Sequence, residues 1–154
     1  MNKTVTLVIF LIINFGGLAL GSWLMNNGPE TDWYLNLKKA PWTPPGWVFG
    51  AAWTTIMICF SIYLANLFSV RKSKFIIIIF IIALILNISW NYVFFNQHQI
   101  TLGLINIIAL TLTIIYFFIS FGDDKISKLR YLLLPYIIWL CLATSLNAYI
   151  VLNN

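Results

Sequence analysis

The sequence predicts an all-α integral membrane protein, a bundle of five transmembrane helices with a long folded loop between the first two. Of its 154 residues, 61% are hydrophobic and only 8% are charged, whereas soluble domains are about 25% charged. The charged residues cluster, and they leave charge-free runs at 4–29, 40–70, 75–122 and 131–154. Because a membrane-spanning helix needs about 20 apolar residues, three of these runs hold one helix each and the run at 75–122 holds two. We therefore expect a single transmembrane domain over 1–154.

The composition also excludes several classes of protein. A mean hydropathy of +0.91 excludes intrinsic disorder. The net charge is +5, but the basic residues lie in short loops, where they set topology and contact lipid headgroups, so we expect no nucleic-acid partner. Cys59 and Cys141 lie in apolar runs, and we interpret them as small buried residues rather than as a disulfide or zinc ligands.

The first span is expected at 5–25. Lys3 and the tripeptide Ala19-Leu20-Gly21 resemble a secretory signal and its cleavage site, but the apolar stretch is long enough to cross a membrane, so we interpret it as a retained helix. Gly17 and Gly21 form a GxxxG motif, which permits close helix packing. The motif fits packing inside one subunit and a dimer contact equally well.

The loop at 26–43 carries several aromatic residues. Asp32 is predicted to cap a short helix that contains Trp33 and Tyr34, and Pro41 is predicted to end it. Because so much of the loop is apolar, we expect it to fold back over the bundle.

The second span is expected at 44–68. Thr43 is predicted as its N-cap, with Pro44 and Pro45 in the first turn, where the N–H that proline lacks is not needed. Phe49 and Trp53 lie along this helix.

The third span, 75–95, changes character along its length. Its first half, 76–86, is aliphatic and is expected to face lipid. In the second half polar and aromatic residues recur at i, i+3, i+4 and i+7, which is one face of a helix: Asn87, Trp90, Asn91 and Phe94.

The last two spans are expected at 101–121 and 130–152, with a charged loop at 122–129 between them. Pro135 is predicted to kink the fifth helix, because it leaves the carbonyl of Tyr131 without its N–H partner.

Charge placement predicts the orientation. The N-terminus and the turns at 69–74 and 122–130 share one side of the membrane and hold seven Lys and Arg residues, whereas the other side holds two. The positive-inside rule therefore places the N-terminus in the cytoplasm and the long loop outside. Helical spans favour a bacterial inner membrane.

Apart from Arg130 at the very start of the fifth, the spans contain no Asp, Glu, Lys, Arg or His, which argues against a proton-driven transporter or pump. An odd number of spans cannot be divided into two equal inverted halves, which argues against the usual architecture of a secondary transporter. His98 is the only histidine and lies in a turn, so we interpret it as a surface residue and expect no metal site, no Ser-His-Asp triad and no cofactor.

Aromatic and amide residues remain as the candidates for chemistry. Trp53 and Trp139 each lie nine residues from the start of their helix, about 13 Å into the membrane. This is deeper than the interfacial belt expected of Trp23, Trp33, Trp42 and Trp47. The spans also hold the amides Asn87, Asn91 and Asn147, which form hydrogen bonds between helices or line a cavity. A cavity of indole faces and few amides suits a large, flat, apolar ligand.

Three motifs resemble the TspO family, the tryptophan-rich sensory proteins related to the mitochondrial translocator protein. They are the loop segment WYLNLKKAPWTPPG at 33–46, NISWN at 87–91 with Phe94 and Phe95, and LPYIIW at 134–139 with Ala143, Thr144, Leu146 and Asn147. The loop departs from the usual form in one respect, because Ala40 separates Lys39 from Pro41. The motifs lie in the family's order and cover essentially the whole chain.

The resemblance implies a five-helix homodimer that binds tetrapyrroles such as protoporphyrin, and benzodiazepine-type ligands, between the helices. The ligand-binding residues nominated on this basis are Tyr34, Pro44, Phe49, Trp53, Asn87, Trp90, Phe94, Tyr136, Trp139, Ala143 and Asn147. Trp53 and Trp139 match the tryptophans assigned to light-dependent porphyrin breakdown in bacterial members. Lys38 and Lys39 are expected to hold the porphyrin carboxylates.

The cholesterol-associated pattern of animal members is incomplete here. The stretch at 146–152 contains Leu146 and Tyr149 but no following basic residue, so cholesterol is not expected as a partner.

Three functions therefore stay open. The first is a membrane receptor or carrier for tetrapyrroles. The second is an enzyme that degrades porphyrin with light and oxygen. The third is a regulatory membrane partner protein whose pocket is incidental.

Overall fold

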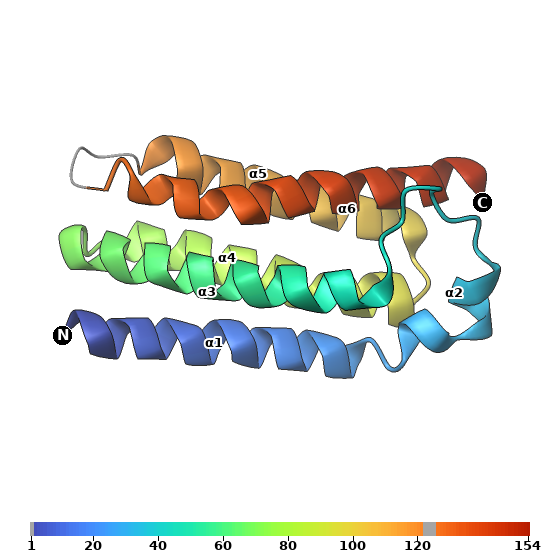
Figure 1. Ribbon diagram of the computed structural model, residues 1–154, viewed down its shortest axis with the longest axis horizontal. Coiled ribbons are helices and arrows are strands. Elements are labelled where there is room, and N and C mark those ends of the chain that lie inside the picture. Colours follow the sequence, from blue (N-terminus) through green and yellow to red (C-terminus); the bar gives the residue numbers. More distant parts are fainter. Residues whose placement is uncertain (1, 122–125) are drawn as a thin grey trace.

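The computed structural model describes residues 2–121 and 126–154 and forms a bundle of five long helices (Figure 1). These helices are α1 (Lys3–Leu24), α3 (Gly46–Val70), α4 (Lys74–Asn91), α5 (Ile100–Ser120) and α6 (Leu134–Asn153). Within the described residues, five helical stretches are long and apolar enough to cross a membrane. The predicted five-helix fold is therefore confirmed. Part of the predicted charged loop, 122–125, lies outside the described residues.

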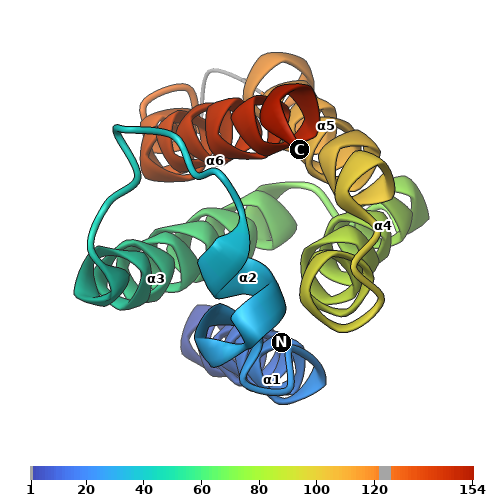
Figure 2. The ribbon, with the colours of Figure 1, turned by 90° about the vertical axis from the view of Figure 1, so that its right-hand side faces the viewer.

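The five helices form a closed ring around the bundle axis. In the end-on view α1 lies between α3 and α4, α4 contacts α5, α5 contacts α6, and α6 returns to α3 (Figure 2). The short helix η3 (Leu129–Leu133) leads into α6 and also packs against α3.

The hydrophobic core is concentrated toward the end of the ring that carries the N-terminus. Phe60 and Tyr63 of α3 pack edge-on against Phe117 of α5, with ring centroids 5.9 and 6.2 Å from it. Phe60 also packs against Tyr136 of α6 at 5.5 Å. A separate, smaller cluster, centred on Phe94 and Phe95, lies at the opposite end. One end of the bundle is thus filled by interlocked rings, and the other holds less core.

The GxxxG motif packs α1 against α4 inside the chain. A Cβ atom at Gly17 would lie 2.7 Å from Leu84 Cδ1, and one at Gly21 would lie 2.7 Å from Asn91 Nδ2. Of the two uses left open by the sequence, the motif serves packing within the subunit.

Buried amides and hydroxyls join neighbouring helices. Asn14 Nδ2 of α1 donates to Ser61 Oγ of α3 at 2.8 Å, and Asn106 Nδ2 of α5 donates to Ser89 Oγ of α4 at 2.8 Å. Tyr63 OH donates to the carbonyl of Phe117 at 3.1 Å. Such bonds contribute about 0.6 kcal/mol each on average in a membrane, so packing remains the main source of stability.

The segment that links α1 to α3 folds back over the end of the ring, as predicted (Figure 2). We call residues 25–45 the covering segment; it contains η1 (Gly28–Glu30) and α2 (Asp32–Asn36). The predicted cap at Asp32 is wrong by one residue. Thr31 caps α2, because its Oγ1 accepts the N–H of Tyr34 at 3.4 Å, and Asp32 occupies the first turn.

The start of α3 also differs from the prediction. Thr43 does not cap α3; its hydroxyl donates to the carbonyl of Ala40 at 2.7 Å, and α3 begins at Gly46. The reason is that Pro44 precedes Pro45 and is therefore disfavoured in the helical region, so it cannot serve as the first helical residue after a cap at Thr43.

Pro135 does not kink a continuous helix. It lies in the first turn of α6, where no N–H is required. The preceding η3 is a 3₁₀ helix, and its Tyr131 carbonyl accepts the N–H of Leu134. The change from a 3₁₀ helix to an α-helix therefore gives the Tyr131 carbonyl a hydrogen-bond donor, although we expected this carbonyl to have none.

Two burial predictions are wrong in part. The aliphatic half of α4 does not face lipid entirely, because Ile76, Ile79, Phe80 and Ala83 form a buried stripe. Cys141 is exposed on α6 and Cys59 is half-buried. An exposed thiol carries little cost where the surroundings are apolar, because free cysteine behaves as a small hydrophobe.

The adjacent glycines of α1 provide a matched test of this packing. We expect Gly17→Leu to lower the free energy of unfolding by about 1–3 kcal/mol, since the added side chain overpacks the contact with α4. Gly16→Leu should have little effect, because no atom lies within 4 Å of a Cβ built there. Thermal unfolding in detergent, followed by circular dichroism, would compare them. Equal effects of the two substitutions would contradict the α1–α4 contact.

Candidate functional site

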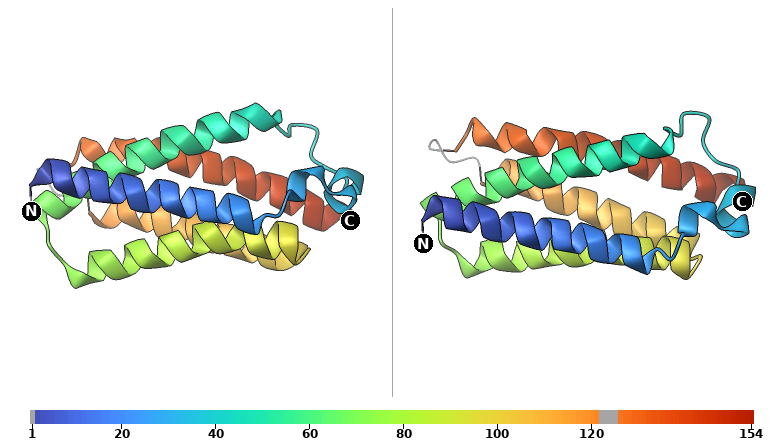
Figure 3. Two further views of the ribbon diagram at one scale, coloured as in Figure 1. Left: turned by 90° about the horizontal axis from the view of Figure 1, so that it is seen from below. Right: turned by 60° about the horizontal axis from the view of Figure 1, so that its bottom comes forward.

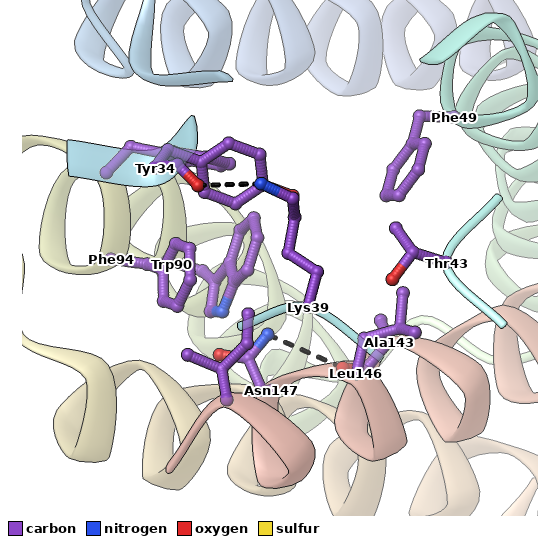
Figure 4. Close-up of a pocket in the computed structure, with 11 residues that line it drawn as sticks. Tyr34, Lys39, Thr43, Phe49, Trp90, Phe94, Ala143, Leu146 and Asn147 are labelled. Carbon is purple, nitrogen blue, oxygen red and sulfur yellow. Dashed lines mark hydrogen bonds between the residues drawn. The ribbon is translucent and has the colours of Figure 1, made fainter. Parts of the chain in front are cut away.

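A small pocket lies beneath the covering segment, between α2 and the ends of α3, α4 and α6 (Figure 4). Its volume is about 40 Å³, whereas ligand sites usually measure about 300–1,000 Å³. In this conformation the pocket is therefore closed. It is lined by Tyr34, Lys39, Thr43, Phe49, Trp90, Phe94, Phe95, Ala143, Leu146, Asn147 and Ile150.

A π-helical turn builds one wall of the pocket. After Asn91 the third membrane span, α4, continues as η2 (Tyr92–Asn96), in which the N–H of Gln97 donates to the carbonyl of Tyr92 at 2.9 Å. Both Phe94 and Phe95 are buried as a result. In a regular α-helix two consecutive side chains point about 100° apart, so the wider turn brings both rings toward the pocket.

The aromatic residues of this wall hold one another in place. Trp90 stacks on Phe94 with their ring planes 9° apart and centroids at 5.2 Å. Trp33 packs edge-on against Phe94 at 5.6 Å and stacks on His98 at 4.1 Å. His98 is exposed, as predicted, and it helps to fix α2 over the pocket.

Lys39 is the one charged side chain among the residues that line the pocket. Its Nζ donates to the carbonyls of Tyr34 and Leu35 at 2.9 and 3.2 Å, and lies 4.7 Å from the centroid of the Tyr34 ring. The ammonium group therefore caps the C-terminal end of α2, where the helix dipole favours a cation. Burial raises the pKa of Tyr34 above its usual value, because the charged phenolate is less stable away from water.

Two buried polar atoms of the pocket have no hydrogen-bond partner. They are Trp90 Nε1, a donor, and Asn147 Oδ1, an acceptor, and the two side chains point toward one another across the pocket (Figure 4). Leaving a buried polar group unpaired costs roughly 1–3 kcal/mol. A ligand group that both accepts and donates would satisfy both atoms.

The covering segment is tied to α6 by several contacts. Asn154 Oδ1 accepts the backbone N–H of Lys38 at 3.0 Å, and Asn154 Nδ2 donates to the carbonyl of Lys38 at 3.3 Å. Trp42 Nε1 donates to Ser145 Oγ at 3.1 Å, and its ring packs against Tyr149. Access from this side requires these contacts to break.

The structure brings together seven of the residues nominated from the sequence, namely Tyr34, Lys39, Phe49, Trp90, Phe94, Ala143 and Asn147. Pro44 and Asn87 do not line the pocket, and Lys38 is exposed outside it.

The three remaining residues lie in the aromatic core that adjoins the pocket. Trp139 packs edge-on against Phe49, with centroids 5.1 Å apart. Trp53 packs against Tyr136 at 5.9 Å. A single ring, that of Phe49, therefore separates Trp139 from the pocket.

Sequence reasoning missed four residues of the lining. Leu146 and Ile150 follow Ala143 at helical spacing, so the face of the last helix could have revealed them. Phe95 reaches the pocket through the π turn, and Thr43 through the turn that precedes α3. Neither conformation has a signal in the hydrophobic pattern. Among the described residues, no group of three or more His, Cys, Asp or Glu could hold a metal ion.

Comparison with known proteins gives a consistent result. The family model described as TspO/MBR family matches residues 8–152. The chain is 34% identical to the tryptophan-rich protein TspO of Archaeoglobus fulgidus over 100% of this chain and 97% of that protein. It is 32% identical to the tryptophan-rich protein TspO of Chlorobaculum tepidum over 77% of each chain. It is 28% identical to the human translocator protein over 85% of this chain and 79% of that protein.

Two asparagines test whether the unpaired acceptor costs stability. Asn147→Leu replaces that acceptor with an apolar side chain of similar shape, so we expect an unchanged or higher melting temperature for the ligand-free protein in detergent. Asn106 also has an unpaired Oδ1, but its Nδ2 joins α5 to α4. Asn106→Leu should therefore lower the melting temperature. A lower value for Asn147→Leu would contradict the cost assigned to the pocket.

Proposed function

Because the chain belongs to the TspO/MBR family, we propose that it is a multi-pass membrane receptor or carrier that binds a tetrapyrrole in the pocket beneath α2. Benzodiazepine-type ligands would occupy the same pocket. The observation that carries the proposal is the composition of the wall, in which stacked aromatic rings surround one cation and two unpaired polar atoms. Flat rings stack on such walls, while a few polar groups fix their orientation.

Charge supports a tetrapyrrole with carboxylate groups. Lys39 lines the pocket and is bound only to carbonyl oxygens, which are weaker partners for an ammonium group than a carboxylate. Lys38 is exposed. Of the two lysines nominated from the sequence, we propose that Lys39 holds a porphyrin carboxylate.

The closed pocket must open before such a ligand can enter. Its 40 Å³ is far below the roughly 300–1,000 Å³ of typical ligand sites. Ligand binding therefore selects a conformation in which the aromatic wall separates. The apparent affinity of the ligand is its affinity for the open form multiplied by the fraction of protein that is open, because the closed form cannot bind.

The neighbouring lysines supply a matched pair for testing the site. We expect Lys39→Met to weaken protoporphyrin binding about tenfold, which corresponds to about 1.4 kcal/mol, and Lys38→Met to leave it unchanged. Saturable quenching of tryptophan fluorescence in detergent, measured in dim light, would give the dissociation constants.

Protoporphyrin dimethyl ester is the chemical control for this comparison. The ester lacks the negative charge, so Lys39→Met should not weaken its binding. Linear quenching by protoporphyrin that is identical in all variants would mean that the ligand only partitions into detergent. The regulatory-partner function would then be favoured.

The contact between Phe49 and Trp139 favours light-dependent porphyrin degradation as a second candidate function. Indole is a reasonable one-electron donor to a photoexcited porphyrin, and Trp139 lies one ring away from the pocket. Trp53 lies farther away, against Tyr136. We propose Trp139 as the primary photochemical residue and Trp53 as its auxiliary.

Turnover under illumination separates an enzyme from a binding protein. An enzyme would consume many equivalents of protoporphyrin, and Trp139→Phe would slow the reaction more than Trp53→Phe. A binding protein that only promotes bleaching of its bound porphyrin would stop after about one equivalent of porphyrin had been degraded. Absorbance of the porphyrin, followed against the amount of protein, distinguishes the two.

We further propose a cytoplasmic N-terminus, an inner-membrane location and a homodimer. The excess of Lys and Arg on the N-terminal side supports this orientation. Because Gly17 and Gly21 pack against α4, the dimer would use another surface, for which the exposed isoleucines of α4 are available. These are Ile77, Ile78, Ile81, Ile82 and Ile85.

A further inference from the structure

A second, larger hollow opens on the outside of the ring between α3 and α6. Figure 3 shows the two helices diverging toward the end of the bundle that carries α2. The hollow has a volume of about 330 Å³, so it is several times larger than the closed pocket. We call it the α3–α6 groove. It is lined by Val48, Ala51, Ala52, Thr55, Ile56, Pro135, Ile138, Trp139 and Leu142.

The groove lies at the depth of the hydrocarbon. Ile56 is ten residues beyond the start of α3, which corresponds to about 15 Å along the helix. Trp139 and Leu142 lie in the middle of the last span, Leu129–Asn153. Except for the hydroxyl of Thr55 and the indole N–H of Trp139, the side chains that line the groove are apolar, so its solvent is the bilayer interior.

One pair of rings separates the groove from the pocket. Phe49 lines the pocket and Trp139 lines the groove, and their rings meet edge to face with centroids 5.1 Å apart. The next turn of α6 repeats the arrangement, because Leu142 faces the groove and Ala143 faces the pocket. The two hollows therefore share a wall that is one aromatic layer thick.

The shared wall is held less firmly than the covering segment. Asn154 and Trp42 tie that segment to α6 through three hydrogen bonds. Where α3 and α6 border the groove, they meet through apolar and aromatic side chains. Rotation of the Phe49 ring breaks no hydrogen bond.

We propose that the α3–α6 groove is a membrane-facing binding site, in which a flat apolar ligand dissolved in the bilayer rests before it passes the Phe49–Trp139 pair into the pocket. This inference rests on the proposed function and adds the route by which the ligand arrives. Three features select this occupant: the hydrocarbon depth, a volume within the range of ligand sites, and the wall shared with the pocket.

Two exposed alanines allow the route to be tested without altering the pocket. Ala51 lines the groove, and Ala19 lies on the outer surface of α1. With protein in phosphatidylcholine vesicles and the uncharged protoporphyrin dimethyl ester as the probe, stopped-flow quenching of tryptophan fluorescence gives association and dissociation rates. We expect Ala51→Phe to slow both rates about tenfold and to leave the dissociation constant within twofold of the wild type. Ala19→Phe should change neither rate.

An unchanged dissociation constant also shows that Ala51→Phe is folded and that its pocket is intact. If Ala51→Phe associates as fast as the wild type, the ligand does not cross the groove, and a lipid acyl chain is its occupant. That result would overturn the proposal.

Asn154→Ala tests the competing route. This substitution removes both hydrogen bonds to the backbone of Lys38, so a route under the covering segment would become several times faster. We expect no change in the association rate, and an increase would overturn the proposal. Absence of saturable quenching in the wild type would instead refute tetrapyrrole binding itself, and the lateral site with it.

Discussion

The aromatic core at the N-terminal end of the bundle is the interaction on which the rest of the structure depends. Phe60, Tyr63, Phe117 and Tyr136 come from three different helices and interlock edge to face. In a membrane, helices gain little from apolar burial alone, so the quality of such packing decides where they stay together. Because α3 and α6 are held here, they can diverge at the other end without the bundle coming apart. The pocket and the groove both lie in the part of the bundle that this core leaves open.

The pocket has features that a purely structural cavity would lack. A π turn, two unpaired polar atoms and a lysine bound to backbone carbonyls all border the same pocket. Each is less favourable than its regular alternative, and such departures gather at functional sites. The glycine contact between α1 and α4 lies on the far side of the same wall and fixes the helix from which the π turn continues. The packing of α1 against α4 thus stabilises the helix whose C-terminal end forms the less favourable π turn.

The number, order and approximate bounds of the helices could be predicted from the sequence, because clustered charges and long apolar runs leave few alternatives in a membrane. Seven residues that line the pocket also followed from the family motifs and the helical spacing.

Local details were harder to predict. The start of α3 depended on the conformational limits that successive prolines impose. The break before α6 depended on a 3₁₀ turn that satisfied the Tyr131 carbonyl. The burial of Phe95 depended on a change of helix type that hydrophobic periodicity does not encode. The depth of Trp53 and Trp139 in the membrane followed from their distance along each helix. Their separation from the pocket did not, because Phe49 lies between Trp139 and the pocket and Trp53 packs against Tyr136.

Under the proposed function, the position of Lys39 makes the fold of the covering segment depend on the charge of the ligand. Its ammonium group stabilises the last turn of α2 through two carbonyl oxygens, so a bound carboxylate competes directly with the secondary structure of the cover. A neutral ligand can fill the same pocket and leave that turn intact. Two ligands of equal affinity would then produce two different outer surfaces, one with α2 capped and one with it released. A partner protein that reads this surface would respond to the charge of the ligand rather than to the occupancy of the site.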